Sequence, residues 1–477
     1  MGFLKQYKLE IIFFGFIISL FFFSRLISLL SVPIFTDEAI YLRWAQIAKN
    51  DAAWRFISLT DGKQPLFVWL VMIVMRFISD PLMAGRIVSV LAGFTTIVGL
   101  FFLGKEVFKN RWIGITSSFL YVIYPFALVY DRMALYDSLV GTFSVWGLYF
   151  AILMVRRLRL DIALILGMII GAGVLNKTSG FFSLYLLPLT LILFDFAKKE
   201  RYLRFVRWAG LALIAGILTY VYYSMLRLSP FFHLIDQKNA IFVYPLQEWL
   251  KHPFIYFWGN LSIGQWDWLT RYMTMPTLAL VVISFFLKSR DYVREKALLI
   301  FWFAIPFAAL ALFGKTLYPR FIFFMTLSLL PLVAFSLFQL NKMIKNKIFF
   351  AFCFLLFAFL QLRSDYFILA DFARAPIPES DLGQYINNWP AGGGINEIIS
   401  FLEQRASKEK IYIATEGTFG SLPTNSVEIY LGDNKNVDKR GIWPLPTKIP
   451  KDLIEKAESM PVYFIFNETQ YPPPPVD

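Results

Sequence analysis

The sequence contains one cysteine, two histidines and few charged residues for a chain of 477. The single cysteine, Cys353, lies inside an apolar run, which excludes an intramolecular disulfide framework and a cysteine-based metal site. Charged residues make up 17% of the chain, whereas soluble domains contain about 25%. Hydrophobic residues make up 57%. This composition predicts a polytopic membrane protein.

Acidic residues are also scarce relative to basic ones, with 33 Asp and Glu against 46 Lys and Arg. In a soluble chain this excess would suggest nucleic-acid binding. Here the basic residues gather in short segments between apolar runs, as the positive-inside rule requires, so no nucleic-acid partner is expected. The dense basic segments are 105–111, 156–159, 198–207, 288–296 and 342–347.

The apolar runs predict about eleven transmembrane helices. The first, 9–30, is too long for a signal-peptide core and reads as a retained span. The run 66–79 has about 14 residues, fewer than the roughly 20 that a span needs, and is expected to be a juxtamembrane helix. If 66–79 does not cross the membrane, the N-terminus and every dense basic segment lie on the cytoplasmic face. The other spans are expected near 83–104, 112–130, 137–155, 160–176, 179–196, 206–226, 274–287, 297–313, 320–339 and 348–369.

The C-terminal segment, from about residue 371 onward, differs from the rest of the chain in its predicted secondary structure. Strands are expected at 410–415, 427–431 and 462–466, with one helical pattern at 395–406 before them and another at 450–459 before the last strand. The sequence therefore predicts a membrane domain over 1–370 and a small extracytoplasmic α/β domain over 371–477. The triple glycine 392–394 lacks a following Gly-Lys-Ser/Thr, so we interpret it as a flexible turn rather than a phosphate loop.

Asp37 and Glu38 stand directly after the first span. Carboxylates near hydrocarbon are unfavourable and by default mark a functional site. Asp37 is a candidate proton acceptor or metal ligand. The structural alternative is that Asp37 caps a helix beginning near Glu38, which the helical spacing of Ile40 and Trp44 favours.

A second polar group, 130–137, is expected at the same outer rim. It contains Asp131, Arg132 and Asp137. Asp137 would be a second carboxylate at the start of a span, and the planar fork of Arg132 suits a phosphate. The structural alternative is a polar turn with a weak Asp131–Arg132 surface pair.

Further cations are expected at outer helix ends. Lys63, Lys177 and Arg320 can each be interfacial anchors or phosphate ligands. The aromatic-rich loop 227–273 is interpreted as an interfacial helical loop, with a substrate lid as the alternative. His233 and His252 lie in this loop and are most simply loop residues.

With these residues in view, the chain resembles the membrane-embedded C-type glycosyltransferases that use polyprenyl-phosphate sugars. It is most similar to the branch of protein O-mannosyltransferases and lipid A aminoarabinose transferases. The segments that carry the resemblance share one predicted face. They are Asp37-Glu38 with Tyr41, Lys63-Gln64-Pro65-Leu66, Ala84-Gly85-Arg86, Arg132 with Asp137, Asn176-Lys177 and Tyr318-Pro319-Arg320.

The resemblance implies an inverting sugar transfer from a polyprenyl-phosphate donor on the outer face of the cell membrane. The acceptor would be a protein, a lipid or a glycan. The candidate catalytic residues are Asp37, Glu38 and Asp137. Asp37 would be the catalytic base or acceptor contact, and Asp137 would orient the site or help hold a divalent cation. The residues expected to bind the lipid phosphate and substrate are Lys63, Arg132, Lys177, Tyr318, Arg320 and Tyr41.

Two positions depart from the family's pattern. Gln64 replaces a proline, and Thr178 replaces a glycine. Two functions from other classes compete with transfer. A flippase for lipid-linked sugars would place charges at mid-membrane, and a non-catalytic envelope scaffold would leave Asp37 without a role.

Overall fold

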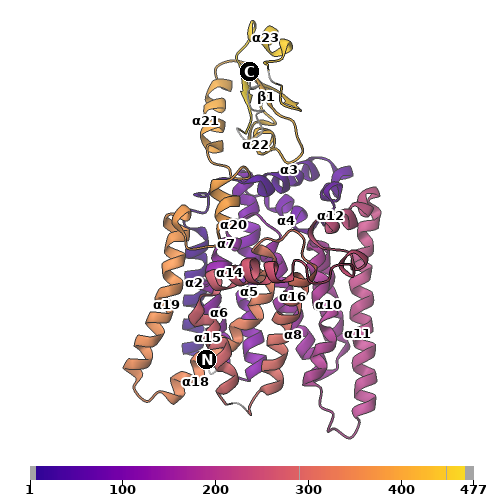
Figure 1. Cartoon of the computed structure of the whole chain (residues 1–477), viewed down its shortest axis with the longest axis vertical. Helices are drawn as coiled ribbons and strands as arrows, with labels where there is room; N and C mark the ends of the chain where they lie inside the picture. The colour runs from indigo at the N-terminus through magenta and orange to yellow at the C-terminus, as the bar shows by residue number, and fades with distance from the viewer. Residues whose placement is uncertain (1–6, 289, 447, 468–477) are drawn as a thin grey trace. The chain divides into compact units, whose positions relative to one another are not determined.

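The computed structural model describes residues 7–288, 290–446 and 448–467, and it is helical apart from one small sheet (Figure 1). The chain divides into two compact units. The first contains the residues up to Ser28, 56–67 and 86–378, and the second contains 29–55, 68–85 and the residues from Glu379 onward. The predicted boundary at residue 370 stays a prediction.

Seven helical segments of the described chain are long and apolar enough to cross a membrane. They are α2 (Lys8–Leu26), α5 (Pro81–Phe108), α8 (Asp137–Arg157), α11 (Arg201–Ser224) continued by η5 (Met225–Leu228), α16 (Val293–Phe313), the segment Arg320–Met343, and α19 (Lys347–Ala370). The segment Arg320–Met343 consists of α17 (Arg320–Thr326), η8 (Leu327–Leu329) and α18 (Leu330–Met343).

Two bent helix pairs raise the number of candidate spans to nine within the described residues. Helix α6 (Arg111–Val122) meets α7 (Pro125–Asp131) at 62°, where Pro125 begins the second helix. The segment Gly259–Met273, made of η7 (Gly259–Gln265) and α14 (Trp266–Met273), meets α15 (Met275–Phe286) at 90°. Proline cannot continue a preceding helix because it lacks an N–H group, which accounts for the first break.

The two remaining predicted spans correspond to shorter apolar helices, α9 (Leu160–Asn176) and the segment Thr178–Leu193. The second consists of η3 (Thr178–Phe181), α10 (Phe182–Tyr185) and η4 (Leu187–Leu193). Helix α4 (Leu66–Val74) has 9 residues and is about 14 Å long, too short for a hydrocarbon core of about 30 Å. The predicted all-α, multi-pass membrane fold is confirmed.

The loop 227–273 is largely helical, as predicted. Besides η7 and α14 it contains η6 (Pro230–His233), α12 (Leu234–Phe242) and α13 (Leu246–Trp249). Two backbone hydrogen bonds hold it to the end of α16. The Tyr244 N–H donates to the Phe313 carbonyl over 2.8 Å, and the Lys315 N–H donates to the Phe242 carbonyl over 2.8 Å.

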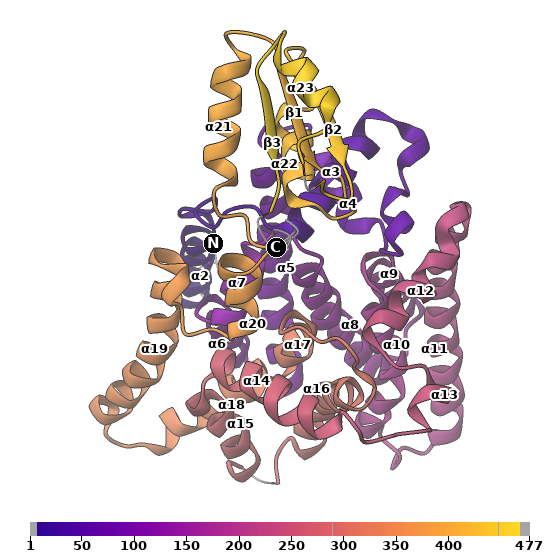
Figure 2. The same cartoon turned by 45° about the horizontal axis from the view of Figure 1, so that its top comes forward.

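The second unit contains the sheet, a parallel one with strand order β2-β1-β3. The strands are β1 (Ile411–Glu416), β2 (Val437–Ile442) and β3 (Val462–Ile465), and Figure 2 shows them side by side. The helical elements that lie wholly in this unit are α3 (Thr36–Asn50), η1 (Ala52–Trp54), α20 (Glu379–Leu382), η10 (Gly383–Asn387), α21 (Ile395–Ala406), α22 (Leu422–Leu431) and α23 (Lys451–Ala457). The predicted small C-terminal α/β fold is confirmed.

One predicted strand was wrong. Residues 427–431 belong to helix α22, although Val427 and Ile429 are β-branched. The Ser421 hydroxyl accepts a hydrogen bond from the Thr424 N–H at the start of this helix, and Pro423 occupies its first turn. Capping and burial against neighbouring elements override the local strand propensity. The third strand of the sheet is β2, which was not predicted.

Candidate functional site

Asp37 lies inside the first turn of α3 and not at its cap. The N-cap is Phe35, so the interpretation of Asp37 as the capping residue was wrong. The start of α3 is instead fixed by Thr36, whose N–H and hydroxyl both donate to the Pro390 carbonyl, over 3.0 and 3.1 Å. Asp37 is half-buried and lies in the first turn of α3, where an acidic side chain interacts favourably with the helix dipole.

Glu38 and Tyr41 occupy the same helix but are buried. The Glu38 side chain is fully buried, and its carboxylate accepts a hydrogen bond from the Phe35 N–H over 3.4 Å. Tyr41 is 4% exposed, and its ring lies 5.8 Å from that of Trp44. These contacts favour a role for Glu38 in positioning the first turn of α3.

Lys177 and Asp137 form an ion pair in the first unit. Lys177 follows the last residue of α9, and its Nζ lies 2.7 Å from Oδ1 of Asp137, the first residue of α8. The adjacent Asn176 side chain donates to the Tyr136 carbonyl over 3.0 Å, which fixes the two helix ends together. Lys177 and Asp137 are both predicted site residues, but their pairing was not predicted.

Two other predicted cations, Lys63 and Arg320, affect the pKa of Lys177. Burial lowers the pKa of the Lys177 ammonium, Asp137 raises it, and the positive charges of Arg320 and Lys63 lower it further. Arg320 begins α17 and stacks on Tyr318, with its guanidinium carbon 5.0 Å from the ring centre. The Lys177 ammonium lies 4.9 Å from the ring centre of Phe321. Lys63 and Arg320 are thus near enough to act on Lys177 electrostatically. With Lys238, which shares the Asp61 carboxylate with Lys63, four cations face the two carboxylates of Asp137 and Asp61, an excess of positive charge suited to an anionic ligand.

The two positions that depart from the family's pattern contact each other. The Gln64 side-chain amide donates a hydrogen bond to the Thr178 hydroxyl over 2.6 Å. Gln64 follows Lys63, and Thr178 follows Lys177, so this bond ties together the segments that carry two of the cations. On the other side of Lys63, the Asp61 carboxylate lies 3.5 Å from Lys63 and 2.7 Å from Lys238 of α12.

Arg132 has a different set of partners. Its Nη1 donates to the carbonyls of Ser24, Arg25 and Ile27 over 3.1, 3.0 and 2.7 Å. Its Nη2 donates to the Ser28 carbonyl over 2.8 Å. The last carbonyls of a helix have no partner within the helix, and Arg132 supplies donors to those at the end of α2. These contacts favour a structural role, and phosphate binding by Arg132 stays a prediction.

A buried ion pair within the apolar helices was not predicted. Asp131 pairs with Arg25 of α2 over 3.3 Å, not with Arg132, and neither side chain is exposed. The Asp131 carboxylate also accepts hydrogen bonds from the hydroxyls of Tyr121 and Ser138, over 2.9 and 3.0 Å. The expected weak surface pair of Asp131 and Arg132 was therefore wrong. Arg25 inside an apolar run was the available signal, because a charge there requires a partner.

The described residues contain no group of three or more His, Cys, Asp or Glu side chains that could hold a metal ion. Asp137, the residue expected to help hold a divalent cation, already has an ammonium partner in Lys177.

The first comparison with known proteins concerns sequence families. Residues 62–224 match the family described as dolichyl-phosphate-mannose-protein mannosyltransferase. This range includes Lys63, Arg132, Asp137 and Lys177, but not Asp37. No curated protein matches the chain significantly.

Solved structures of ArnT from Cupriavidus metallidurans share the fold. The apo structure aligns with a TM-score of 0.54 at 14% identity, over 96% of this chain and 90% of that one. The structure bound to undecaprenyl phosphate aligns with a TM-score of 0.55 at the same identity and coverage. The archaeal oligosaccharyltransferase AglB from Archaeoglobus fulgidus aligns with a TM-score of 0.49 at 13% identity, over 91% of this chain and 65% of that one.

The family match and the ArnT-like fold confirm the predicted resemblance. They also confirm the predicted class of protein, a multi-pass membrane glycosyltransferase.

Proposed function

We propose that this protein transfers a sugar from a polyprenyl-phosphate donor to a hydroxyl-bearing acceptor, with inversion, at the outer face of the cell membrane. The observation that supports this most directly is the set of contacts around Lys177. Its ammonium pairs with Asp137 and lies 4.9 Å from the ring centre of Phe321, which follows Arg320, and the Gln64–Thr178 bond ties the segment of Lys63 to that of Lys177. The family match and the undecaprenyl phosphate bound by the ArnT structure agree with a lipid-phosphate donor.

The proposed step uses charges that the chain supplies itself. The acceptor oxygen attacks the anomeric carbon, the bond from that carbon to the phosphate oxygen breaks, and polyprenyl phosphate leaves. Lys63, Lys177 and Arg320 stabilise the negative charge that grows on the departing phosphate. Asp37 takes the proton of the acceptor hydroxyl as general base. Asp137 orients Lys177, and Tyr318 orients Arg320 through the stacked contact.

Glu38 and Tyr41 are the other two candidate site residues of α3. The hydrogen bond from the Phe35 N–H to Glu38 fixes the first turn of α3, and the turn carries Asp37. Tyr41 lies one helical turn after Asp37 and is proposed to line the substrate site.

The experiment that tests this function is sugar transfer in membranes supplied with polyprenyl-phosphate sugars, comparing the parent with Asp37→Asn. The substitution keeps the shape and removes the charge, so we expect a loss of about 10²–10⁴-fold. The matched control is Asp51→Asn, at the other end of α3, where the exposed carboxylate accepts a hydrogen bond from the Ala53 N–H. Full activity of Asp37→Asn would remove Asp37 from the reaction.

The orientation in the membrane is part of the proposal. The basic segments indicate a cytoplasmic N-terminus and an extracytoplasmic C-terminal domain. In a Cys353→Ser background, single cysteines at Lys199 and Glu409 should react with an impermeant thiol reagent from opposite sides of the membrane. Labelling of both from the same side would contradict this orientation.

A further inference from the structure

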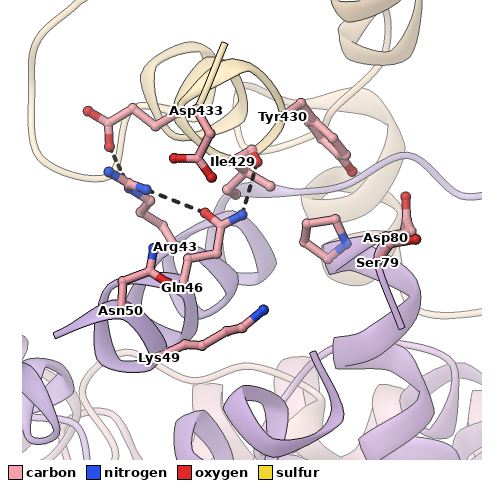
Figure 3. Close-up of a pocket in the computed structure, with 11 residues that line it drawn as sticks. Arg43, Gln46, Lys49, Asn50, Ser79, Asp80, Ile429, Tyr430 and Asp433 are labelled. Carbon is pink, nitrogen blue, oxygen red and sulfur yellow. Dashed lines mark hydrogen bonds and ion pairs between the residues drawn. The ribbon is translucent and has the colours of Figure 1, made fainter. Parts of the chain in front are cut away.

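A polar cavity of about 480 Å³ lies within the second unit, between α3, the turn 79–81 and the end of α22 (Figure 3). Its walls include Arg43, Gln46 and Lys49 from α3, together with Tyr430 and Asp433. The volume falls within the range of about 300–1,000 Å³ that is typical of small-ligand sites. Such sites are usually lined mainly by apolar groups, whereas this one is mainly polar.

Direct contacts between α3 and α22 build the cavity wall. Arg43 Nε lies 2.7 Å from Oε2 of Glu428, and Arg43 Nη1 donates to the Gln46 side chain over 3.4 Å. The Gln46 amide in turn donates to the Ile429 carbonyl over 2.9 Å. Figure 3 shows this chain of bonds along one side of the cavity. The polar groups are therefore held in place before any ligand arrives, which lowers the entropy cost of binding.

The charges that line the cavity nearly balance. Arg43 and Lys49 supply two positive charges, and Asp80, Glu428 and Asp433 supply three negative ones. A site for a phosphate or another anion would need an excess of cations, which this cavity lacks. Mixed carboxylate, amide and cationic groups can both accept and donate hydrogen bonds, and a neutral ligand with many hydroxyl groups uses both. Tyr430 adds an aromatic ring to the wall.

The cavity lies on a different face of α3 from Asp37. Gln46 follows Asp37 by nine residues, which is two and a half turns and about 13 Å along the helix axis. Because this separation exceeds two full turns by half a turn, the side chains of Asp37 and Gln46 lie on opposite faces of α3. The cavity is therefore separate from the Asp37 carboxylate, and a group bound in it would lie away from the reacting hydroxyl.

We propose that this cavity binds a neutral saccharide portion of the acceptor. Use of the cavity by an acceptor rests on the proposed transfer function, whereas saccharide binding itself does not. A remote contact of this kind binds the ground state and the transition state alike, so it lowers the acceptor KM and leaves kcat unchanged.

The test measures binding without a donor, so its result is independent of catalysis. The purified full-length chain in lipid nanodiscs is examined by saturation-transfer NMR with neutral tri- and tetrasaccharides of glucose, mannose or N-acetylglucosamine. Ser79→Trp fills the cavity from an exposed position in its wall. Ser407→Trp is the matched control, since Ser407 is an exposed residue of the same unit and does not line the cavity.

We expect at least one saccharide to bind the parent and Ser407→Trp equally, and Ser79→Trp at least 10-fold more weakly. Absence of binding by every saccharide at millimolar concentration would overturn the proposal, as would equal binding by Ser79→Trp. In competition experiments, inorganic phosphate and a hydrophilic hexapeptide are each expected to leave the bound saccharide in place. Displacement by either would assign the cavity to an anion or to a peptide instead.

Discussion

Gln64 donates a hydrogen bond to Thr178 over 2.6 Å, and these are the two positions at which the chain departs from the pattern of the family it resembles. Each residue lies next to a cation of the candidate site, Lys63 or Lys177. A proline and a glycine have no side-chain donor or hydroxyl, so the bond requires both departures together. The bond sets the spacing of two lysines that are proposed to hold one phosphate.

The first prediction concerns this bond. Thr178→Val removes the hydroxyl with little change in shape, and Gln64→Leu removes the donor. Each single variant should raise the donor KM, by about 3–10-fold if the bond contributes about 1 kcal/mol. The double variant should be little worse than either single one, because the two side chains act as one unit. Additive effects in the steady-state kinetics of the four proteins would contradict this coupling.

The second prediction is a pH dependence. Burial and the neighbouring cations lower the pKa of Lys177 from its usual value of 10.5. The charged form holds the phosphate, so kcat/KM for the donor should fall as pH rises through this lowered pKa, at lower pH than an ordinary lysine would titrate. Lys177→Arg should shift this alkaline decline upward, since a guanidinium stays charged. Profiles of kcat/KM against pH measure both effects.

The control for the pH profile is Lys342→Arg, at an exposed position in the last turn of α18. It should leave the alkaline decline where the parent has it. An unchanged decline in Lys177→Arg would show that another group titrates.

The third prediction concerns the triple glycine. A Cβ added to Gly392 would lie 1.7 Å from the Ile34 carbonyl oxygen, whereas one added to Gly393 meets nothing within 4 Å. Pro390, two residues before Gly392, accepts both hydrogen bonds from Thr36 at the start of α3. Gly392→Ala should therefore displace the first turn of α3 and lower sugar transfer at least 10-fold.

Gly393→Ala is the matched control and should transfer sugar at the parental rate, because its backbone is not strained and its surroundings are open. Transfer assays on both variants at equal membrane expression make the comparison. Equal activity of the two alanine variants would show that the position of Asp37 does not depend on this close approach.

The sequence predicted the helices of the membrane fold because long apolar runs leave few alternatives in a bilayer. It did not predict β2, because Val437–Ile442 contains Asp438, Lys439 and Arg440. This strand lies at the edge of the sheet, where charged side chains are common. The strand predicted at 427–431 was wrong because β-branched residues favour a strand, whereas here they pack within helix α22.

The candidate site was predictable as a set of residue types but not as a set of contacts. Lys63, Lys177, Arg320 and Asp137 stood out because charges at span ends are few. Which of them pair depends on how distant helix ends meet, and the order of residues along the chain does not contain this. Arg132 illustrates the point, since its four carbonyl partners near the end of α2 are more than 100 positions away.

The last prediction concerns the ion pair between Arg25 and Asp131, which is fully buried. Arg25→Met leaves an unpaired carboxylate among apolar helices, and breaking such a pair typically costs about 3–5 kcal/mol. Arg25→Met/Asp131→Asn removes the charge but keeps an oxygen that can accept the hydrogen bonds of Tyr121 and Ser138. The double variant should therefore be more stable than Arg25→Met.

Thermal unfolding of the purified proteins in one detergent provides the measurement, with Arg271→Met as control. Arg271 pairs with Asp267 over 2.8 Å, but both side chains are about 40% exposed, so its loss should cost about 0–1 kcal/mol. We expect the order of apparent Tm to be parent, Arg271→Met, the double variant and then Arg25→Met. If Arg25→Met unfolds at the same temperature as Arg271→Met, the buried pair does not stabilise the packing of α2, and its role must be sought in the reaction instead.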